Sequence, residues 1–229
     1  MARSKRGRNL KDWKTNRADP GVGKLRIIGG TYRGRLIEYS GDPVTRPMKD
    51  NIREALFNLI GGWVPGKVII DLFAGTGAIG LESLSRGATA AIFVERHFPT
   101  VRIIEQNVAS IAEDIADKSQ VHASDTFFWV RRFVEREDRP SEPWMVFCCP
   151  PYDFFVDREE EVLAMLKSLI DLAPPQSIFI VEADTRFDQT VLPNLSEASQ
   201  VKCEEDDRPE WQVRRYAQAI VSVLKIPEA

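Results

Sequence analysis

Cysteine and histidine are scarce in this sequence, and their scarcity excludes several classes of protein. The three cysteines among 229 residues, Cys148, Cys149 and Cys203, cannot all pair within one chain, so no disulfide framework is predicted. Two histidines, His97 and His122, and the lack of a C-x-x-C pair argue against a structural zinc site. We predict no metal site and a reducing, cytoplasmic location.

Long apolar runs are also absent. No run of about 18 apolar residues occurs, so no transmembrane helix is predicted. The segment MARSKRGRNLKDWK carries basic residues with no apolar stretch after them, which is not the pattern of a secretory signal. With 43% hydrophobic and 28% charged residues, the composition is that of a folded globular protein and excludes a wholly disordered or collagen-like chain.

Charge is distributed unevenly along the chain. Residues 1–35 hold eleven Lys or Arg against two Asp, a net charge of +9, which leaves −12 for the rest of a chain with a net charge of −3. A basic segment of this kind is typical of an arm that binds a polyanion such as nucleic acid, because phosphate contacts release counterions. The alternative is a poorly ordered terminus that binds nothing.

Strand and helix patterns alternate from residue 67 onward. The predicted strands are 68–73, 91–95, 120–123, 145–149 and 177–182, and the predicted helices between them are 78–86, 98–110, 125–136 and 158–171. This alternation predicts a doubly wound, mainly parallel α/β sheet. A charged strand near 198–206 and an apolar strand at 217–225 have no helix between them, so we expect an antiparallel hairpin at one edge of the sheet.

The residues before position 61 do not follow this strand–helix alternation. We expect a flexible basic arm at residues 1–23, a β-hairpin at 25–39 and a helix at 50–60. The hairpin and helix, residues 24–60, would extend a Rossmann-like core at 61–229, and the two parts would form one domain.

A glycine-rich turn follows the first strand of the alternating region. Gly75, Gly77 and Gly80 have the spacing G-x-G-x-x-G between a strand and a helix, where glycine permits a tight turn and close approach of a ligand. Glu95 ends the next strand, where an acid can accept hydrogen bonds from ribose hydroxyls. These features alone predict NAD binding.

Asp71 favours a different ligand. It lies within the otherwise apolar end of the first strand, four residues before the first glycine, where a buried carboxylate is costly without a partner. A pyrophosphate would raise that cost, whereas a cationic ligand, such as the amino group of a methionine moiety, would offset it. The turn D-L-F-A-G-T-G therefore fits S-adenosylmethionine better than a dinucleotide. The alternative is a strand-to-helix turn that binds nothing, with Asp71 as a cap.

A proline turn ends the strand at 145–149, near the middle of the predicted sheet. Its residues are Cys149, Pro150, Pro151 and Tyr152, at the edge where open α/β sheets bind ligands. The two prolines fix a rigid turn. Tyr152 offers a flat face to a planar substrate such as an extruded base.

These motifs together resemble the bacterial 16S rRNA guanine-N2 methyltransferases of the RsmD type. The resemblance rests on LRIIGGTYRGR, TRPMKDNIREALFN (45–58), DLFAGTGAIGLESLSRGA (71–88) and the PPY turn, which occur in this order. It covers roughly residues 24–225. It implies methyl transfer from S-adenosylmethionine to the N2 amine of an extruded guanine in small-subunit rRNA, free or in a ribosomal particle. We expect a monomer with no membrane partner.

The resemblance also implies roles for the matching residues. Asp71, Gly75 and Gly77 would hold the methionine part of the cofactor, Glu95 the ribose and Asp125 the adenine amine. The predicted cofactor-binding residues are Asp71, Phe73, Ala74, Gly75, Thr76, Gly77, Glu95, Arg96, Asp125 and Thr126. The predicted RNA-binding residues are Arg26, Arg33, Arg35, Arg46 and Arg53. The predicted catalytic residues are Cys149, Pro150, Pro151 and Tyr152.

Cys149 departs from the family's turn, which reads Asp or Asn, then Pro-Pro, then Tyr or Phe. A side-chain oxygen at this position and the Pro150 carbonyl would accept the two N–H bonds of the amine, and a thiol is a weak acceptor. Three interpretations stay open. Backbone carbonyls or Asp153 orient the amine, or the protein binds cofactor and RNA with weak or lost transfer, or the target differs, including thiolate attack on a pyrimidine C5. An NAD-dependent oxidoreductase is a further alternative, which Asp71 disfavours.

Overall fold

The structure is a computed structural model that describes residues 23–39, 48, 50–196, 198–201, 208–216 and 219–228. Three sequence predictions therefore fall outside the described residues. These are the basic arm, apart from its last residue, the RNA contact at Arg46, and Cys203.

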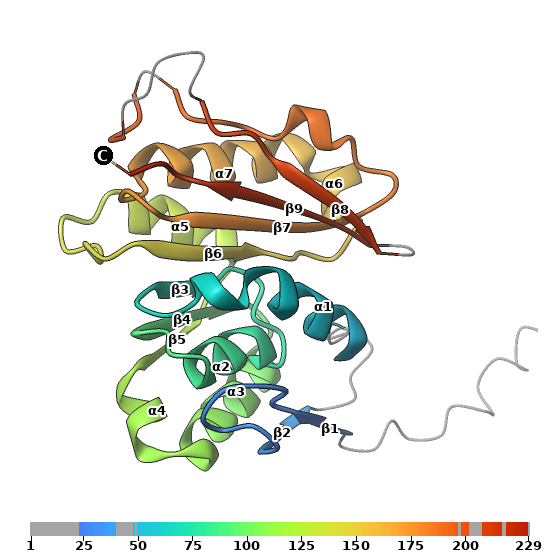
Figure 1. Cartoon of the computed structure of the whole chain (residues 1–229), viewed down its shortest axis with the longest axis vertical. Coiled ribbons are helices and arrows are strands. Elements are labelled where there is room, and N and C mark those ends of the chain that lie inside the picture. The colour runs from blue at the N-terminus through green and yellow to red at the C-terminus, as the bar shows by residue number, and fades with distance from the viewer. Residues whose placement is uncertain are drawn as a thin grey trace, which may run out of the picture.

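A seven-stranded sheet forms the centre of the described chain, with the strand order β5-β4-β3-β6-β7-β9-β8 (Figure 1). The strands are β3 (Val68–Asp71), β4 (Ala90–Glu95), β5 (Ser119–Ala123), β6 (Trp144–Cys148), β7 (Ile178–Asp184), β8 (Gln212–Tyr216) and β9 (Ala219–Lys225). The five strands β3 to β7 pair with one another in parallel, whereas β9 pairs antiparallel with both β7 and β8. This confirms the predicted α/β sheet and the central position of β6.

Helices cover both faces of the sheet. They are α1 (Asp50–Ile60), α2 (Ala78–Ser85), α3 (Phe98–Ile111), α4 (Glu113–Asp117), α5 (Thr126–Val134), α6 (Phe154–Asp157) and α7 (Glu159–Leu172), with short 3-10 turns η1 (Gly61–Trp63) and η2 (Gln189–Val191). Because successive strand side chains point to opposite faces, Ile70 packs in one core with α5 and α7, and Ile69 in another with α1, α2 and α3. Burial on both faces explains the continuous apolar runs of these strands.

The N-terminal hairpin is a separate two-stranded sheet docked on α2. Strand β1 (Gly23–Arg26) pairs antiparallel with β2 (Leu36–Tyr39), as predicted. The fully buried carboxylate of Glu82 accepts hydrogen bonds from the N–H groups of Ile28 (2.6 Å) and Gly29 (2.8 Å) and from Arg86 Nε (2.7 Å). The hairpin is therefore fixed to the first helix of the core by a buried charged group.

A second contact joins the hairpin to the glycine turn. The Asn107 amide on α3 accepts from the Glu38 N–H and donates to the Glu38 carbonyl, both at 2.8 Å. The same amide nitrogen donates to the Thr76 carbonyl at 3.3 Å. One buried side chain thus links β2 to the turn that follows β3.

The C-terminal region corrects one prediction. Residues 198–201 form no strand, and β8 lies at 212–216, in the segment that the sequence assigned to a charged connection. The rest of the predicted strand, residues 202–206, lies outside the described residues. Charge alone does not separate an edge strand from a loop, and the exposed residues of QVRRY alternate only weakly. The predicted antiparallel hairpin at the sheet edge is confirmed, with β8 as the partner of β9. Among the described helices, none is long and apolar enough to cross a membrane.

Candidate active site

The carboxyl ends of the central strands meet where the strand order reverses. The chain runs outward from β3 through β4 to β5, then returns to β6 on the other side of β3 and continues to β7. Asp71 ends β3, Glu95 ends β4 and Cys149 directly follows β6, so the topology brings all three to one edge. Open α/β sheets bind ligands at such a switch point.

Glycine is required in the turn after β3. Gly75 and Gly77 have φ angles of 52° and 76°, in the left-handed region that side chains disfavour. A Cβ atom at Gly80 would lie 2.2 Å from the ring of Phe93, so the third glycine allows α2 to pack closely on β4. The turn therefore exposes backbone where a ligand would approach.

Glu95 braces this turn from the neighbouring strand. Its Oε2 accepts a hydrogen bond from the Gly75 N–H at 2.9 Å, and its Oε1 accepts one from the His97 N–H at 2.8 Å. The N–H of Ala74 donates to the Val94 carbonyl at 3.0 Å and adds a second tie to β4. A carboxylate has about four lone-pair sites, so Glu95 can hold the turn and still accept ribose hydroxyls.

Asp71 carries a buried carboxylate with no hydrogen-bond partner among the described residues. The residue is 1% exposed, as its strand position predicts, and both oxygens are buried. Burial raises the pKa of Asp71 to about 7, the charge of Glu95 adds to this rise, and the nearby N–H groups of Gly80 and Phe73 only partly offset it. A cationic group bound here would supply the missing partner.

Three other predicted cofactor residues have structural contacts. Asp125 caps α5 through its Oδ1, which accepts from the Phe128 N–H at 3.1 Å, while its Oδ2 accepts no hydrogen bond from a described residue. Thr126 is buried, and its hydroxyl donates to the Leu72 carbonyl. Thr76 is also buried. Only Asp125 of these three keeps a side-chain atom available to a ligand.

An aromatic cluster lies beside the glycine turn. The Phe73 ring meets Phe127 at 6.4 Å and Phe154 at 5.8 Å, both edge to face, and Phe127 and Phe154 stack at 6.2 Å. The guanidinium of Arg96 lies 5.6 Å from the Phe154 ring, and that of Arg158 lies 4.0 Å from the Phe127 ring. Phe73 and Arg96 are among the residues predicted from the sequence and the other three are not, although the Phe154-Phe155 pair follows the proline turn after one residue.

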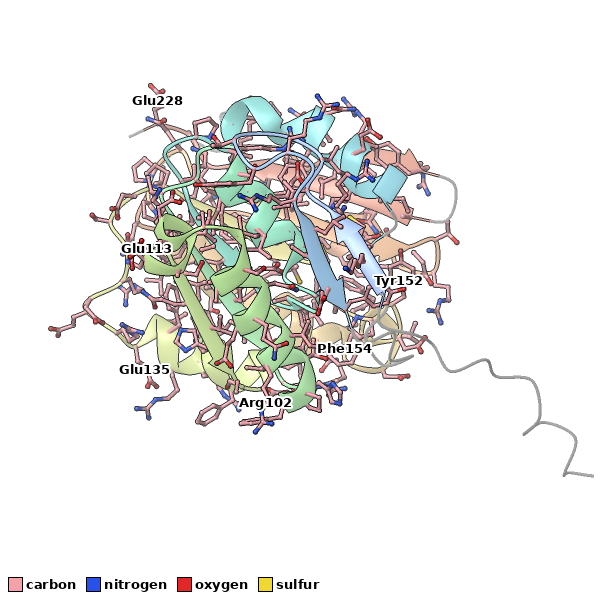
Figure 2. The ribbon with its side chains drawn as sticks, turned by 90° about the horizontal axis from the view of Figure 1, so that it is seen from below. Arg102, Glu113, Glu135, Tyr152, Phe154 and Glu228 are labelled. Carbon is pink, nitrogen blue, oxygen red and sulfur yellow. The ribbon has the colours of Figure 1, made fainter. Side chains whose placement is uncertain are left out.

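The proline turn places Tyr152 against a buried acid. Tyr152 and Phe154 lie on one side of the molecule in Figure 2, opposite Glu113. The Tyr152 hydroxyl donates to Glu182 Oε1 at 2.9 Å. Glu182 lies on β7 and is 8% exposed, and burial raises its pKa. Glu182 is not among the residues predicted from the sequence, although it follows an apolar strand segment as Asp71 does.

The environment of Cys149 keeps its thiol protonated. Burial raises the pKa of Cys149 well above its usual range, and the charges of Glu182 and Asp71 raise it further. Because the thiolate is the nucleophilic form, this shift argues against attack on a pyrimidine C5. Cys148 is fully buried in the core, as expected for a small apolar strand residue, and burial raises its pKa as well.

Asp153 is bound elsewhere. Its Oδ1 accepts a hydrogen bond from Arg186 Nη2 at 2.9 Å, and Arg186 Nε also donates to Asp184 at 2.8 Å. The Asp153 side chain is 73% exposed. These contacts do not favour Asp153 as the group that orients a substrate amine.

The predicted RNA contacts divide into two groups. Arg26, Arg33 and Arg35 are exposed on the hairpin, and the first two line a shallow hollow together with Lys24. Arg53 is 1% exposed, and its Nη2 donates to the Arg26 carbonyl at 2.8 Å. Arg53 therefore holds a hairpin strand from inside and has almost no exposed surface to offer a phosphate, unlike the other three arginines.

Fold and site define a class of protein, the Rossmann-like methyltransferases. The family described as "Conserved hypothetical protein 95" matches residues 25–209, so the chain belongs to this family, which is the RsmD-type family that the sequence motifs resemble.

Relatives and solved structures agree with this membership. "Ribosomal RNA small subunit methyltransferase D" of Escherichia coli is 34% identical over 132 residues, which are 58% of this chain and 62% of the relative. "Putative rRNA methyltransferase YlbH" of Bacillus subtilis is 33% identical over 147 residues, 64% of this chain and 74% of the relative. The structure of "Putative methyltransferase yhhF from Escherichia coli" aligns with a TM-score of 0.64 at 25% identity, over 90% of this chain and all of that one. Less than two thirds of the Escherichia coli relative is therefore matched in sequence.

Proposed function

We propose that this protein transfers a methyl group from S-adenosylmethionine to small-subunit ribosomal RNA, at the exocyclic N2 amine of an extruded guanine. The observation that carries the proposal is the meeting of Asp71, the glycine turn and the Cys-Pro-Pro-Tyr turn at one switch point of the sheet. The substrate class is supported by relatives named as small-subunit rRNA methyltransferases.

The residues present fit this cofactor. Asp71 offers a buried carboxylate whose burial the N–H groups of Gly80 and Phe73 only partly offset, and the α-ammonium of a methionine moiety has the complementary charge. A pyrophosphate would add negative charge beside Asp71 and Glu95, which disfavours NAD. The backbone of Gly75 and Gly77 would lie against the methionine part, and Glu95 and Asp125 would accept hydrogen bonds from ribose and adenine.

The contribution of the chain to the reaction is positioning. Bound S-adenosylmethionine supplies an electrophilic methyl group on a sulfonium. Tyr152 would stack on the extruded guanine, and the Pro150 carbonyl, which accepts no hydrogen bond from a described residue, would accept one N–H of the amine. Such alignment is required because the N2 lone pair is delocalised into the ring. Transfer would form the N–C bond as the C–S bond of bound adenosylmethionine breaks, with the bonding pair passing to sulfur, and the amine would lose a proton.

A second candidate function follows from Cys149. A thiol is a weak hydrogen-bond acceptor, so a protein that binds cofactor and RNA but transfers methyl slowly or not at all is the alternative. NAD-linked oxidation is less favoured, for the charge reason given for Asp71.

The test is transfer of a labelled methyl group to small-subunit RNA and to ribosomal particles. Wild type, Cys149→Asp and Tyr152→Ala are compared, and the product nucleotide is mapped. We expect label at a guanine N2 with the wild type and loss of transfer in Tyr152→Ala. The same Tyr152→Ala protein should keep the thermal stabilisation given by adenosylmethionine, and NAD should give none.

Three results would contradict the proposal. Label at another atom would refute the guanine N2 target. Transfer only by Cys149→Asp would favour the binding relative. Stabilisation by NAD rather than adenosylmethionine would refute the cofactor.

A further inference from the structure

Position 149 lacks the side-chain oxygen of the family's turn, and the neighbouring strand carries a carboxylate at the same edge. We infer that Glu182 supplies the acceptor for the target amine that Asp or Asn supplies in the family's turn. This inference rests on the proposed methyl transfer and adds a catalytic residue to it. Three observations carry it: strand register, a hydrogen bond and the state of the second carboxylate oxygen.

The register places the two residues side by side. Strands β6 and β7 are parallel, and Cys148 pairs with Val181, so Cys149 and Glu182 are the next residues along each strand. Cys148 and Val181 both pack in the core beneath α5 and α7, so their successors point to the opposite face. Adjacent strands lie about 4.8 Å apart, which brings a glutamate side chain within reach of the space beside a cysteine.

A hydrogen bond orients the carboxylate. The Tyr152 hydroxyl donates to Glu182 Oε1 at 2.9 Å, so the residue proposed to stack on the base also holds the carboxylate beside it. At 8% exposure, this bond lies in a region of low dielectric, where hydrogen bonds are stronger than in water. If the Tyr152 ring shifted with the stacked base, this hydrogen bond would draw the Glu182 carboxylate along with it.

The second oxygen is available. Glu182 Oε2 accepts no hydrogen bond from a described residue and is absent from the fully buried side-chain atoms that lack a partner, so it retains contact with solvent. An N–H of the target amine could donate to it without displacing Tyr152. The charge of Glu182 already acts on Cys149, where it raises the pKa of the thiol.

The other hydrogen-bond acceptors near the proline turn have different partners. Asp71 faces the glycine turn, where the cofactor's ammonium group is proposed to bind, and Asp153 accepts from Arg186 at the surface. The Pro150 carbonyl would take one N–H of the amine, and Glu182 Oε2 would take the other. As the N–C bond forms, positive charge grows on N2, and the carboxylate offsets it. The proton of that N–H passes to the carboxylate and then to solvent.

The experiment removes the carboxylate at position 182 on β7 and introduces one at position 149, directly after β6. Methyl transfer to small-subunit rRNA is measured at saturating adenosylmethionine for wild type, Glu182→Gln, Cys149→Asp and the Cys149→Asp/Glu182→Gln double variant. We expect Glu182→Gln to lower kcat by about 10²–10³ with little change in cofactor affinity, as for loss of one preorganised polar group. The kcat of the double variant should be at least tenfold higher than that of Glu182→Gln, because the Cys149→Asp substitution restores an acceptor at the position where the family has one.

A matched control is available on the same strand. Asp184→Asn removes a carboxylate two residues further along β7, which accepts hydrogen bonds from Arg186 and none from Tyr152 or Cys149. It should keep kcat within about twofold. Thermal unfolding of each variant, with and without adenosylmethionine, identifies any variant that fails to fold, and Tyr152→Phe, which keeps the ring but releases Glu182, provides a second variant with an expected loss of several-fold.

Each outcome has one meaning. Loss in Glu182→Gln with recovery in the double variant supports the inference, because a merely structural role would not be rescued at position 149. An active wild type with an equally active Glu182→Gln overturns the inference and leaves the proposed function standing. Transfer by Cys149→Asp alone shows that Glu182 does not replace the missing acceptor. If neither wild type nor Cys149→Asp transfers methyl, the proposed function fails, and the role of Glu182 fails with it.

Discussion

At the scale of single residues, the site contains a carboxylate that destabilises the fold that holds it. Asp71 is 1% exposed, and its folded-state pKa of about 7 lies above the value of 3.8 for an unperturbed aspartate. The folded state therefore holds a proton that the unfolded chain releases. Stability is lost as pH rises from about 4 towards 7, and the loss is complete above that range.

We predict that Asp71→Asn increases the free energy of unfolding at pH 8 by up to about 4 kcal/mol and has little effect at pH 4, since one pKa unit corresponds to about 1.4 kcal/mol. The same variant should lose adenosylmethionine binding. Wild-type affinity should weaken below pH 7, where Asp71 becomes protonated. Urea unfolding and calorimetric titration measure both effects, with exposed Asp157→Asn as the control. Unchanged cofactor affinity in Asp71→Asn would show that the ammonium partner is another residue.

Residues identified from sequence were those whose chemistry is local. Asp71 and the glycine spacing were predictable, because an acid and three glycines between a strand and a helix lie within ten residues and form one local turn. Glu182 was not, because its partner Tyr152 is 30 residues away and only the pairing of β6 with β7 joins them. The resemblance to the family assigned Arg53 to RNA, whereas a long-range hydrogen bond to the Arg26 carbonyl holds its side chain inside the fold.

At the scale of elements, the fit of α2 against β4 fixes the position of the glycine turn. Helix α2 begins directly after Gly77, and Gly80 sits with no space for a side chain against Phe93. The turn and the helix therefore move together.

We predict that Gly80→Ala lowers the free energy of unfolding by about 1–3 kcal/mol through overpacking, despite the better helix propensity of alanine. It should also weaken adenosylmethionine binding, because a shifted α2 displaces the turn. Gly62→Ala is the matched control, since a Cβ there meets nothing within 4 Å. Guanidinium unfolding and calorimetry provide the measurements. Equal stability of the two variants would mean that Phe93 moves aside without cost.

Elements with strong periodicity were predictable, and short or polar ones were not. The parallel strands and α1, α2, α3, α5 and α7 follow apolar patterns that burial on one or two faces dictates. Helices α4 and α6 have five and four residues, too few for a period to show. Strand β8 lies at an edge with mostly exposed side chains, so only its pairing with β9 reveals it.

At the scale of the whole molecule, basic charge is gathered where the hairpin projects. Arg26, Arg33 and Lys24 line one hollow of the hairpin, while the remainder of the chain carries net negative charge. Phosphate contacts of this kind fix the orientation of RNA without reading its sequence.

We predict that Arg26→Ala/Arg33→Ala weakens binding of small-subunit RNA and flattens the dependence of log K on log salt concentration by about 0.7–0.9 for each lost contact. Cofactor affinity should stay unchanged, because neither side chain is among the glycine-turn contacts. Arg132→Ala, an exposed arginine in the last turn of α5, should alter neither quantity. Filter binding across a salt series checks this, and an unchanged slope would place the RNA on another face.

The buried Glu82 contact has a consequence for how the protein can be divided. Ile27 and Ile37 of the hairpin and Phe57 of α1 are each about 1% exposed, in the same core as Phe93. Removing residues 24–60 would uncover that core and leave the Glu82 carboxylate without its two backbone donors. The hairpin is thus not an appended module that could be exchanged between proteins. A fragment that begins at residue 61 would have an open hydrophobic face, and it would aggregate instead of binding cofactor on its own.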